Sequence, residues 1–206
     1  MTAEDIDRIH ADTGATALLS LQTEDCRRPF GVDWEELRGH GEHINLAMVN
    51  APMRDFDSTD QRRNLPHAVR SLHDLLDSDH VVYMHDTSSI NRAPLTALGY
   101  MTFVEMHRPD DAFGEILSKH PHSAPSWEAY EGCRHDLLDI LRENIVVRAY
   151  YLSQEESDRN SEQHWLQAER EMIRISFIST QSPCTRDWIQ AGTCSAQPHD
   201  TTAAIA

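Results

Sequence analysis

Residues 81–94 contain the feature of this sequence that most restricts its fold. The apolar run Val81-Val82-Tyr83-Met84 predicts a strand, and the residues from Arg92 onward predict a helix. We name the segment that links the strand to the helix, and includes the start of the helix, the anion loop. Its sequence is His85-Asp86-Thr87-Ser88-Ser89-Ile90-Asn91-Arg92-Ala93-Pro94. A strand, a tight loop and a helix N-terminus in this order direct backbone N–H groups at an anion. Arg92 adds a forked, permanently charged donor set that suits phosphate or carboxylate.

Hydrophobic periodicity predicts short strands separated by helices along most of the chain. Strands are predicted at 16–22, 43–49, 80–84 and 145–152, and helices at 3–11, 33–39, 58–76, 92–107, 110–119, 127–144 and 165–175. Thr2 and Asp33 are the expected N-caps of the first two helices. From about residue 179 the chain is rich in Ser, Thr, Pro, Gly and Ala without periodicity, which predicts an irregular tail. The alternation indicates an α/β fold.

The composition restricts the class of partner and the compartment. The net charge of −16, from 34 acidic and 18 basic residues, argues against a nucleic-acid partner and favours a basic protein partner or simply solubility. The four cysteines show no metal-ligand or framework spacing, which indicates an intracellular, reducing compartment and no bound metal or other cofactor. No window approaches the roughly 18 apolar residues of a transmembrane helix.

Three stretches of the sequence together carry a resemblance to a known family: residues 30–33, residues 53–57 with 63–69, and the anion loop with its continuation through 98–101 and 118–121. They resemble the starch-excess-type glucan phosphatases of plants and algae, a branch of the dual-specificity phosphatase family that also contains laforin. A weaker similarity at 165–174 is to the terminal helix of short family members. The resemblance implies a dual-specificity phosphatase domain over 1–144, with a central sheet flanked by helices. An extension at 145–178 and the tail at 179–206 follow.

The resemblance also assigns roles within the anion loop. The nucleophilic cysteine of the family falls on Asp86, and the acid that protonates the leaving oxygen falls on Asp55. His85 is expected to support the loop by hydrogen bonding. Ser89 and Asn91 stand where the family has glycines, which indicates a reshaped loop.

The carboxylate of Asp86 changes the expected chemistry. Ionised in this loop, it is expected to pair with Arg92 and to occupy the place of phosphate. Two unit charges about 4 Å apart repel by about 4 kcal/mol at an effective dielectric of about 20. The exception is aspartate acting as the nucleophile itself, but such sites normally recruit a metal, and no acidic partner adjoins Asp86 in the sequence.

Two further groups of residues are candidates for binding. The resemblance places Phe30, Phe56 and Phe103 along a channel where aromatic rings stack on glucan, although ordinary core or rim aromatics would give the same pattern. The extension carries apolar residues that a protein partner could cover, namely Tyr150, Tyr151, Trp165 and Met172. The predicted strand at 145–152 is a candidate to replace the first strands of the family's sheet, which this chain lacks.

These observations predict a catalytically inactive pseudophosphatase that serves as a binding or structural subunit of a larger assembly. The alternative is a glucan-binding or weakly active phosphoglucan phosphatase in plastid starch metabolism. A plastid location is implied by the resemblance alone.

Overall fold

The structure is a computed structural model that describes residues 1–155 and 159–179. Its helices are α1 (Ala3–Thr13), α2 (Glu24–Arg27), α3 (Trp34–His43), α4 (Ser58–Asp77), α5 (Arg92–Gly99), α6 (Pro109–Lys119), α7 (Trp127–Ile140), α8 (Arg142–Glu155) and α9 (Ser161–Ile178). The 3-10 turn η1 (Arg28–Phe30) and the π-helical turn η2 (Tyr100–Val104) complete the helical elements of these residues. The strands are β1 (Ala17–Ser20), β2 (Ala47–Asn50) and β3 (Val82–His85). The predicted tail lies outside the described residues from 180 onward.

The three strands form a parallel sheet in the order β2-β1-β3, which confirms the predicted α/β class. Ala17 pairs with Ala47 on one side and with Val82 on the other, and Ser20 pairs with Asn50 and His85 in the same register. The carboxyl ends of all three strands therefore meet at one edge of the sheet. In open parallel sheets this is the edge at which ligands bind.

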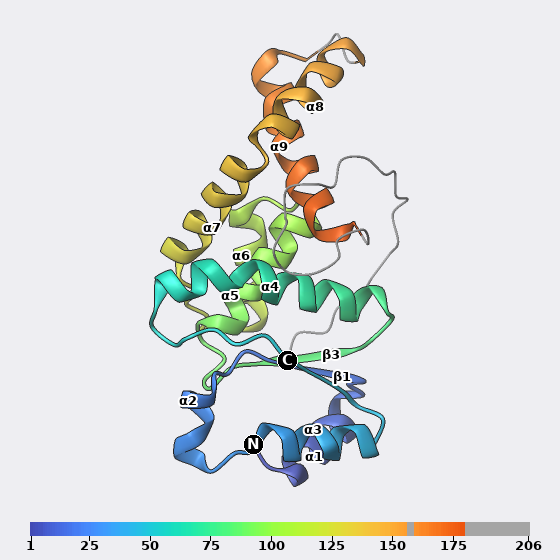
Figure 1. The fold of residues 1–206 in the computed structure, drawn as a ribbon, viewed down its shortest axis with the longest axis vertical. Coiled ribbons are helices and arrows are strands. Elements are labelled where there is room, and N and C mark those ends of the chain that lie inside the picture. The colour runs from blue at the N-terminus through green and yellow to red at the C-terminus, as the bar shows by residue number, and fades with distance from the viewer. Residues whose placement is uncertain (156–158, 180–206) are drawn as a thin grey trace.

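Side chains alternate across β1 and reach two separate apolar cores. Leu18 joins Ile6, Leu37 and Leu46 under α1 and α3. Ala17 and Leu19 belong to the larger core, which is built from α4, α5 and the later helices. Figure 1 shows this layering, with α1 and α3 on one side of the sheet and α4 and α5 on the other.

Helix starts follow the sequence closely. Thr2 forms a capping box with Asp5, and the Asp33 carboxylate accepts the backbone N–H groups of Glu35 and Glu36. Helix α4 extends from Ser58 to Asp77 as predicted, although its N-cap is the preceding residue, Asp57. Local capping chemistry thus fixes where the helices around the site begin.

The predicted strand at 145–152 is wrong, because these residues belong to helix α8. Ile145 and Leu152 are buried seven residues apart, which is two helical turns, and they lie in the same apolar core as α9. The β-branched and aromatic residues that indicated a strand are exposed; Val146, Val147, Tyr150 and Tyr151 are the members of this set. The boundary predicted after residue 144 consequently falls inside α8.

Helix α9 packs against the main core. Phe177 is 1% exposed, and the Arg174 Nε donates to the carbonyl oxygen of Val104 at 3.0 Å. In Figure 1 the far ends of α8 and α9 project away from the sheet. Within residues 1–155 and 159–179 no helix is long and apolar enough to cross a bilayer.

Candidate functional site

The anion loop connects β3 to α5 at the carboxyl edge of the sheet. The backbone N–H of Leu21, just after β1, donates to the carbonyl oxygen of His85 at 2.9 Å, so the loop begins beside the central strand. The far end of the loop is held by the segment after α6. There the Asn91 Nδ2 donates to the carbonyl oxygen of Ala124 at 3.0 Å, and the Ala124 N–H donates to Ile90 at 2.7 Å. Both ends of the loop are therefore fixed by neighbouring elements.

Asp86 occupies the centre of this loop. Its Oδ1 accepts the backbone N–H groups of Ser88 at 2.7 Å and Ser89 at 2.5 Å, and its Oδ2 accepts the N–H of Ala93 at 2.9 Å. The residue is 5% exposed. A carboxylate that accepts three converging backbone donors is bound as an oxyanion would be. The loop therefore binds a negative charge that belongs to the chain itself.

Ser89 takes the left-handed backbone conformation that the loop requires. Its φ is +55°, a region that glycine adopts freely and that other residues adopt at a cost of about 1–2 kcal/mol. Asn91 has a φ of −114° and carries no such strain. Of the two positions, Ser89 therefore has the backbone conformation that favours glycine, and Asn91 does not.

Arg92 is wholly buried behind the loop and donates hydrogen bonds to three segments of the chain. Its Nη2 donates to Asp55 Oδ2 at 3.1 Å and to Thr87 Oγ1 at 3.0 Å. Its Nη1 donates to the Met53 carbonyl oxygen at 3.1 Å and to Cys26 Sγ at 3.3 Å. At 0% exposure the guanidinium does not meet solvent.

The expected pair between Asp86 and Arg92 is not formed, because Arg92 pairs with Asp55 instead. The reason is geometric: the carboxylate of Asp86 turns towards the backbone amides of its own loop. Asp55 lies in the segment before α4, and its carboxylate is the one beside the Arg92 guanidinium. The structure thus brings the predicted acid position and the arginine together, and it holds the loop carboxylate apart from both.

His85 supports the loop from the end of β3. Its Nδ1 lies 3.1 Å from the carbonyl oxygen of Asp86, and because a carbonyl accepts, Nδ1 carries the proton. Burial lowers the pKa of His85 below its ordinary value, which favours the neutral ring. Its Nε2 and the Nε of Arg92 are buried and have no hydrogen-bond partner among the described residues.

Cys26 is the member of the site that sequence analysis missed. Besides the Arg92 contact, its Sγ accepts the hydroxyl of Thr23 at 3.3 Å. Burial raises the pKa of the Cys26 thiol, but the hydrogen bonds from Thr23 and Arg92 outweigh it and leave the pKa below its ordinary value. Nothing in the local pattern around residue 26 indicates contact with a residue 66 positions away.

We expect iodoacetamide to alkylate Cys26 much faster than Cys133 at neutral pH, because only the thiolate reacts. Burial raises the pKa of Cys133 to about 12, whereas the hydrogen bonds from Thr23 and Arg92 hold the pKa of Cys26 below its ordinary value. The rate at Cys26 should rise with pH and level off at a lower pH than the rate at Cys133, as measured by mass spectrometry of the separate cysteine peptides.

Thr23 provides the matched control for that experiment. Thr23→Val removes the hydroxyl donor, so the pKa of Cys26 should rise and its alkylation at neutral pH should slow several-fold, whereas Thr23→Ser keeps the donor and the rate. Equal rates at Cys26 and Cys133, or indifference to Thr23→Val, would show that the contacts do not activate the thiol.

The three aromatic candidates separate into two surface residues and one core residue. Phe30 is 70% exposed and Phe56 is 93% exposed. Phe103 is 2% exposed and stacks between Tyr130 and Phe177, with ring centroids at 5.3 and 5.9 Å. The prediction of Phe103 as a channel aromatic is therefore wrong, since η2 turns its ring into the core against α7 and α9.

The residues predicted for partner binding also separate into exposed and buried ones. Tyr150 and Tyr151 are exposed on α8, and Trp165 is partly exposed on α9 with its Nε1 donating to Glu169 at 2.8 Å. Met172 is buried in the main core, so it offers no surface to a partner. In the described part of the chain no three His, Cys, Asp or Glu side chains are grouped as metal ligands.

The relatives found by comparing the sequence with known proteins include two from plants. The chain is 30% identical over 148 residues to phosphoglucan phosphatase DSP4, amyloplastic, of Castanea sativa. It is 29% identical over 109 residues to phosphoglucan phosphatase LSF1, chloroplastic, of Arabidopsis thaliana. The matches cover 71% and 52% of this chain but 39% and 18% of the relatives. The chain thus spans less than half of either protein. No family model matches it.

Comparison of the structure finds phosphatases of the tyrosine and dual-specificity type. Kinase-associated phosphatase, with its catalytic cysteine replaced by serine, matches with a TM-score of 0.55 at 14% identity over 68% of this chain and 77% of that one. Tk-PTP in its active form gives 0.53 at 15% identity over 65% and 84%, and PTPMT1 in complex with PI(5)P gives 0.52 at 16% over 63% and 81%. The fold is that of these phosphatases, and the sequence is similar to plant phosphoglucan phosphatases.

Proposed function

We propose that this chain is a glucan-binding domain of the phosphoglucan phosphatase type whose anion loop is closed by its own carboxylate. The sequence relatives are named phosphoglucan phosphatases, and the fold is a phosphatase fold. These findings favour the alternative prediction, a glucan-binding or weakly active phosphoglucan phosphatase, over an inactive subunit of a larger assembly. The single observation that supports closure of the loop is that three backbone N–H groups donate to the Asp86 carboxylate.

The contacts of Asp86 and Arg92 argue against turnover by the thiol mechanism. Asp86 offers no thiolate, and it already engages the N–H groups of Ser88, Ser89 and Ala93 that an incoming phosphate would need. Arg92 is occupied by Asp55 and Thr87 and is closed to solvent. A phosphate would have to displace a tethered carboxylate and also tolerate its charge.

Phosphate release from phosphoglucan and from an aryl phosphate tests the loss of catalysis. No release above background is expected from the unmodified chain. If the unmodified chain released phosphate and the Asp86→Ala variant did not, the chain would have an active site and the closed loop would be excluded.

Glucan binding is supported by the surface next to the loop. Phe56 follows Asp55, which contacts Arg92, and Phe30 lies four residues after Cys26, which contacts the same guanidinium. Both rings are exposed, and Phe56 is held at a φ of +56°. Exposed aromatic rings that follow residues of a closed polar loop suit a neutral sugar ring, which needs stacking and no counter-charge.

We expect Phe30→Ala and Phe56→Ala each to weaken binding to amylopectin, by up to about tenfold, since an aromatic contact contributes roughly 0.5–1.5 kcal/mol. The fraction bound is measured by sedimentation with amylopectin at increasing polysaccharide concentration. Tyr150→Ala is the matched control, because Tyr150 is an exposed aromatic on α8. Equal loss in all three variants would indicate nonspecific adsorption, and no loss in the two phenylalanine variants would remove these rings from the binding site.

The second candidate function is that of an inactive subunit bound to a protein partner, and one exposed surface of α8 favours it. The outer side of α8 exposes Val146 and Val147 at 50% and 55% and the paired rings of Tyr150 and Tyr151. Light scattering after size-exclusion chromatography distinguishes the candidates. A stoichiometric complex on purification from the source tissue favours the subunit, and a monomer that binds glucan favours the domain proposed above.

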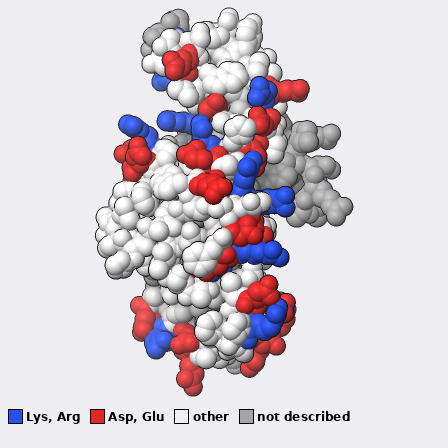
Figure 2. Space-filling view, turned by 90° about the vertical axis from the view of Figure 1, so that its left-hand side faces the viewer, with Lys and Arg blue, Asp and Glu red and all other residues white. Residues whose placement is uncertain are grey.

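A plastid location accompanies the proposal, because the two relatives are named as amyloplastic and chloroplastic proteins. Starch is the phosphoglucan of that compartment. On the face in Figure 2 acidic and basic side chains are interspersed, and neither sign forms a continuous patch.

A further inference from the structure

A surface hollow lies between α2, η1 and the first turn of α3. Its volume is about 500 Å³, which is within the roughly 300–1,000 Å³ range of small-molecule sites. It adjoins the carboxyl edge of the sheet, because Arg27 in its lining bonds to Gln22, which follows β1, and to Asn50, which ends β2. The lining residues are Glu24, Arg27, Arg28, Gly31, Val32, Asp33, Trp34 and Glu35.

Arg27 is held in a fixed position in this hollow. The residue is 8% exposed, and its Nη1 donates to the carbonyl oxygen of Gln22 at 2.8 Å and to Asn50 Oδ1 at 3.2 Å. The guanidinium carbon lies 5.3 Å from the centre of the Trp34 ring, in a cation–π contact. Both hydrogen bonds use Nη1, so Nε and Nη2 have no acceptor among the described residues. The side chain therefore offers positioned, charged donors to a ligand.

The charges around the hollow favour a neutral ligand. The carboxylates of Glu24, Asp33 and Glu35 line it together with two guanidinium groups, of which that of Arg28 lies 4.0 Å from Glu24. An anion would meet three carboxylates, and a cation would meet the buried guanidinium of Arg27. A hydroxyl group can donate to a carboxylate and accept from a guanidinium. The lining thus suits a molecule that carries several hydroxyl groups.

The apolar part of the lining suits the carbon atoms of a sugar ring. Val32 and Trp34 are both half-buried, and both line the hollow. A pyranose ring has apolar C–H groups on its faces and hydroxyl groups around its edge. An indole beside planar charged groups provides a surface for both.

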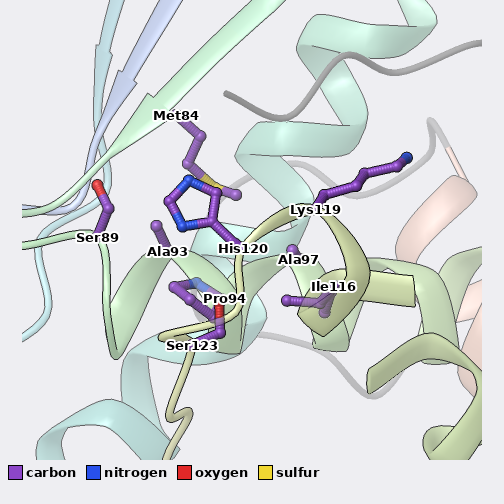
Figure 3. A pocket seen from close by; sticks show the side chains of 9 residues that line it. All are labelled: Met84, Ser89, Ala93, Pro94, Ala97, Ile116, Lys119, His120 and Ser123. Carbon is purple, nitrogen blue, oxygen red and sulfur yellow. The ribbon is translucent and has the colours of Figure 1, made fainter. Parts of the chain in front are cut away.

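The cavity drawn in Figure 3 is too small for such a ligand. It lies behind the anion loop, between α5 and the end of α6, and its volume of about 20 Å³ is room for one water. One water there can bond to Ser123 Oγ, which has no partner among the described residues.

We propose that the hollow between α2 and α3 is a subsite for one neutral sugar residue of a glucan. Arg27 donates to its hydroxyl oxygens, Glu24 and Glu35 accept from its hydroxyl groups, and Trp34 and Val32 pack against its carbon atoms. This inference rests on the proposed glucan-binding function and adds a second place of contact. No residue of the anion loop lines the hollow, so binding there needs no opening of that loop.

Titration of the full chain with maltotriose, followed by NMR, tests the subsite. The backbone amides of Gly31 and Val32 and the indole N–H of Trp34 should shift with one common dissociation constant. Arg27→Met should weaken binding about tenfold, as the loss of hydrogen bonds from a charged donor implies. If Arg27→Met fails to fold, the next pair of variants carries the test.

Glu35→Ala and Glu36→Ala form a matched pair, because both residues are exposed in the first turn of α3 and only Glu35 lines the hollow. Glu35→Ala should weaken maltotriose several-fold, and Glu36→Ala should leave its dissociation constant unchanged. Equal constants in the two variants, or absent shifts at Gly31 and Trp34, would overturn the subsite. Shifts of equal size with free lysine or inorganic phosphate would overturn its assignment to a neutral sugar.

The subsite and the proposed function fail separately. If maltotriose does not bind the hollow while Phe30→Ala and Phe56→Ala still weaken sedimentation with amylopectin, the subsite is wrong and the proposed function stands. If maltotriose binds the hollow while both phenylalanine variants keep their binding to amylopectin, the subsite stands and the two rings are not part of the glucan site.

Discussion

Replacing Asp86 with cysteine is expected to raise phosphate release from an aryl phosphate by at least about a thousandfold, given that removing the nucleophile of a hydrolase costs up to roughly a millionfold in turnover. The substitution releases the N–H groups of Ser88, Ser89 and Ala93 from the carboxylate. It also places a thiolate among these donors, while Arg92 and Asp55 remain together. The loop then has a nucleophile, an oxyanion cradle and an acid in one place.

Asp86→Ser is the control for this gain, because it frees the same backbone donors without supplying a thiolate. It should bind vanadate or phosphate better than the unmodified chain and still turn over no substrate. A chain that already matches the rate of Asp86→Cys would refute the block by the carboxylate. An Asp86→Cys variant as inert as Asp86→Ser would show that the buried pair of Arg92 and Asp55 blocks the chemistry as well.

Replacing Arg92 with methionine is expected to lower the free energy of unfolding by about 3–5 kcal/mol, as is usual when one partner of a buried ion pair is removed. The change leaves the Asp55 carboxylate without its cation and the carbonyl oxygen of Met53 without its donor. In an open phosphatase loop an arginine held for substrate would affect binding more than stability. Here Arg92 is wholly buried and hydrogen-bonded to three segments, so its main effect should be on folding.

Urea denaturation followed by circular dichroism measures this loss. Arg54→Ala is the matched control: the Arg54 side chain is exposed, has no partner among the described residues, and lies next to Asp55. Its removal should change stability by less than about 0.5 kcal/mol. If both variants unfold at the same urea concentration, the contacts of Arg92 do not contribute to stability. Asp55→Ala combined with Arg92→Met should cost less than the sum of the two changes.

Features set by neighbouring residues were predictable from the sequence. Thr2 and Asp33 cap their helices as their side-chain chemistry requires, and the spacing from His85 to Arg92 locates the loop between β3 and α5. The apolar stripe of α4 indicates its length and its buried face. In each case the deciding interaction lies within about one helical turn or one strand of the residue that signals it.

Features set by distant contacts were not predictable. Arg92 pairs with Asp55, 37 positions away, because the segment before α4 reaches the guanidinium while Asp86 bonds within its own loop. Cys26 joins the site through the same arginine. At 145–152 β-branched residues indicated a strand, but burial of Ile145 and Leu152 beside α9 favours a helix. Local preference is weak where packing decides.

The contacts of α9 have a consequence for how the chain folds during synthesis. Phe177 stacks on Phe103, and the Arg70 side chain bonds to the carbonyl oxygen of Ser176, so residues more than 70 positions apart complete one core. Proteins are made from the N-terminus, and a region folds only when its contacts are available. The face of the Phe103 ring that Phe177 covers must therefore stay exposed until α9 has left the ribosome, although Tyr130 of α7 can already cover the other face. Until then this region offers an apolar face to chaperones, although the loop and the sheet are already complete.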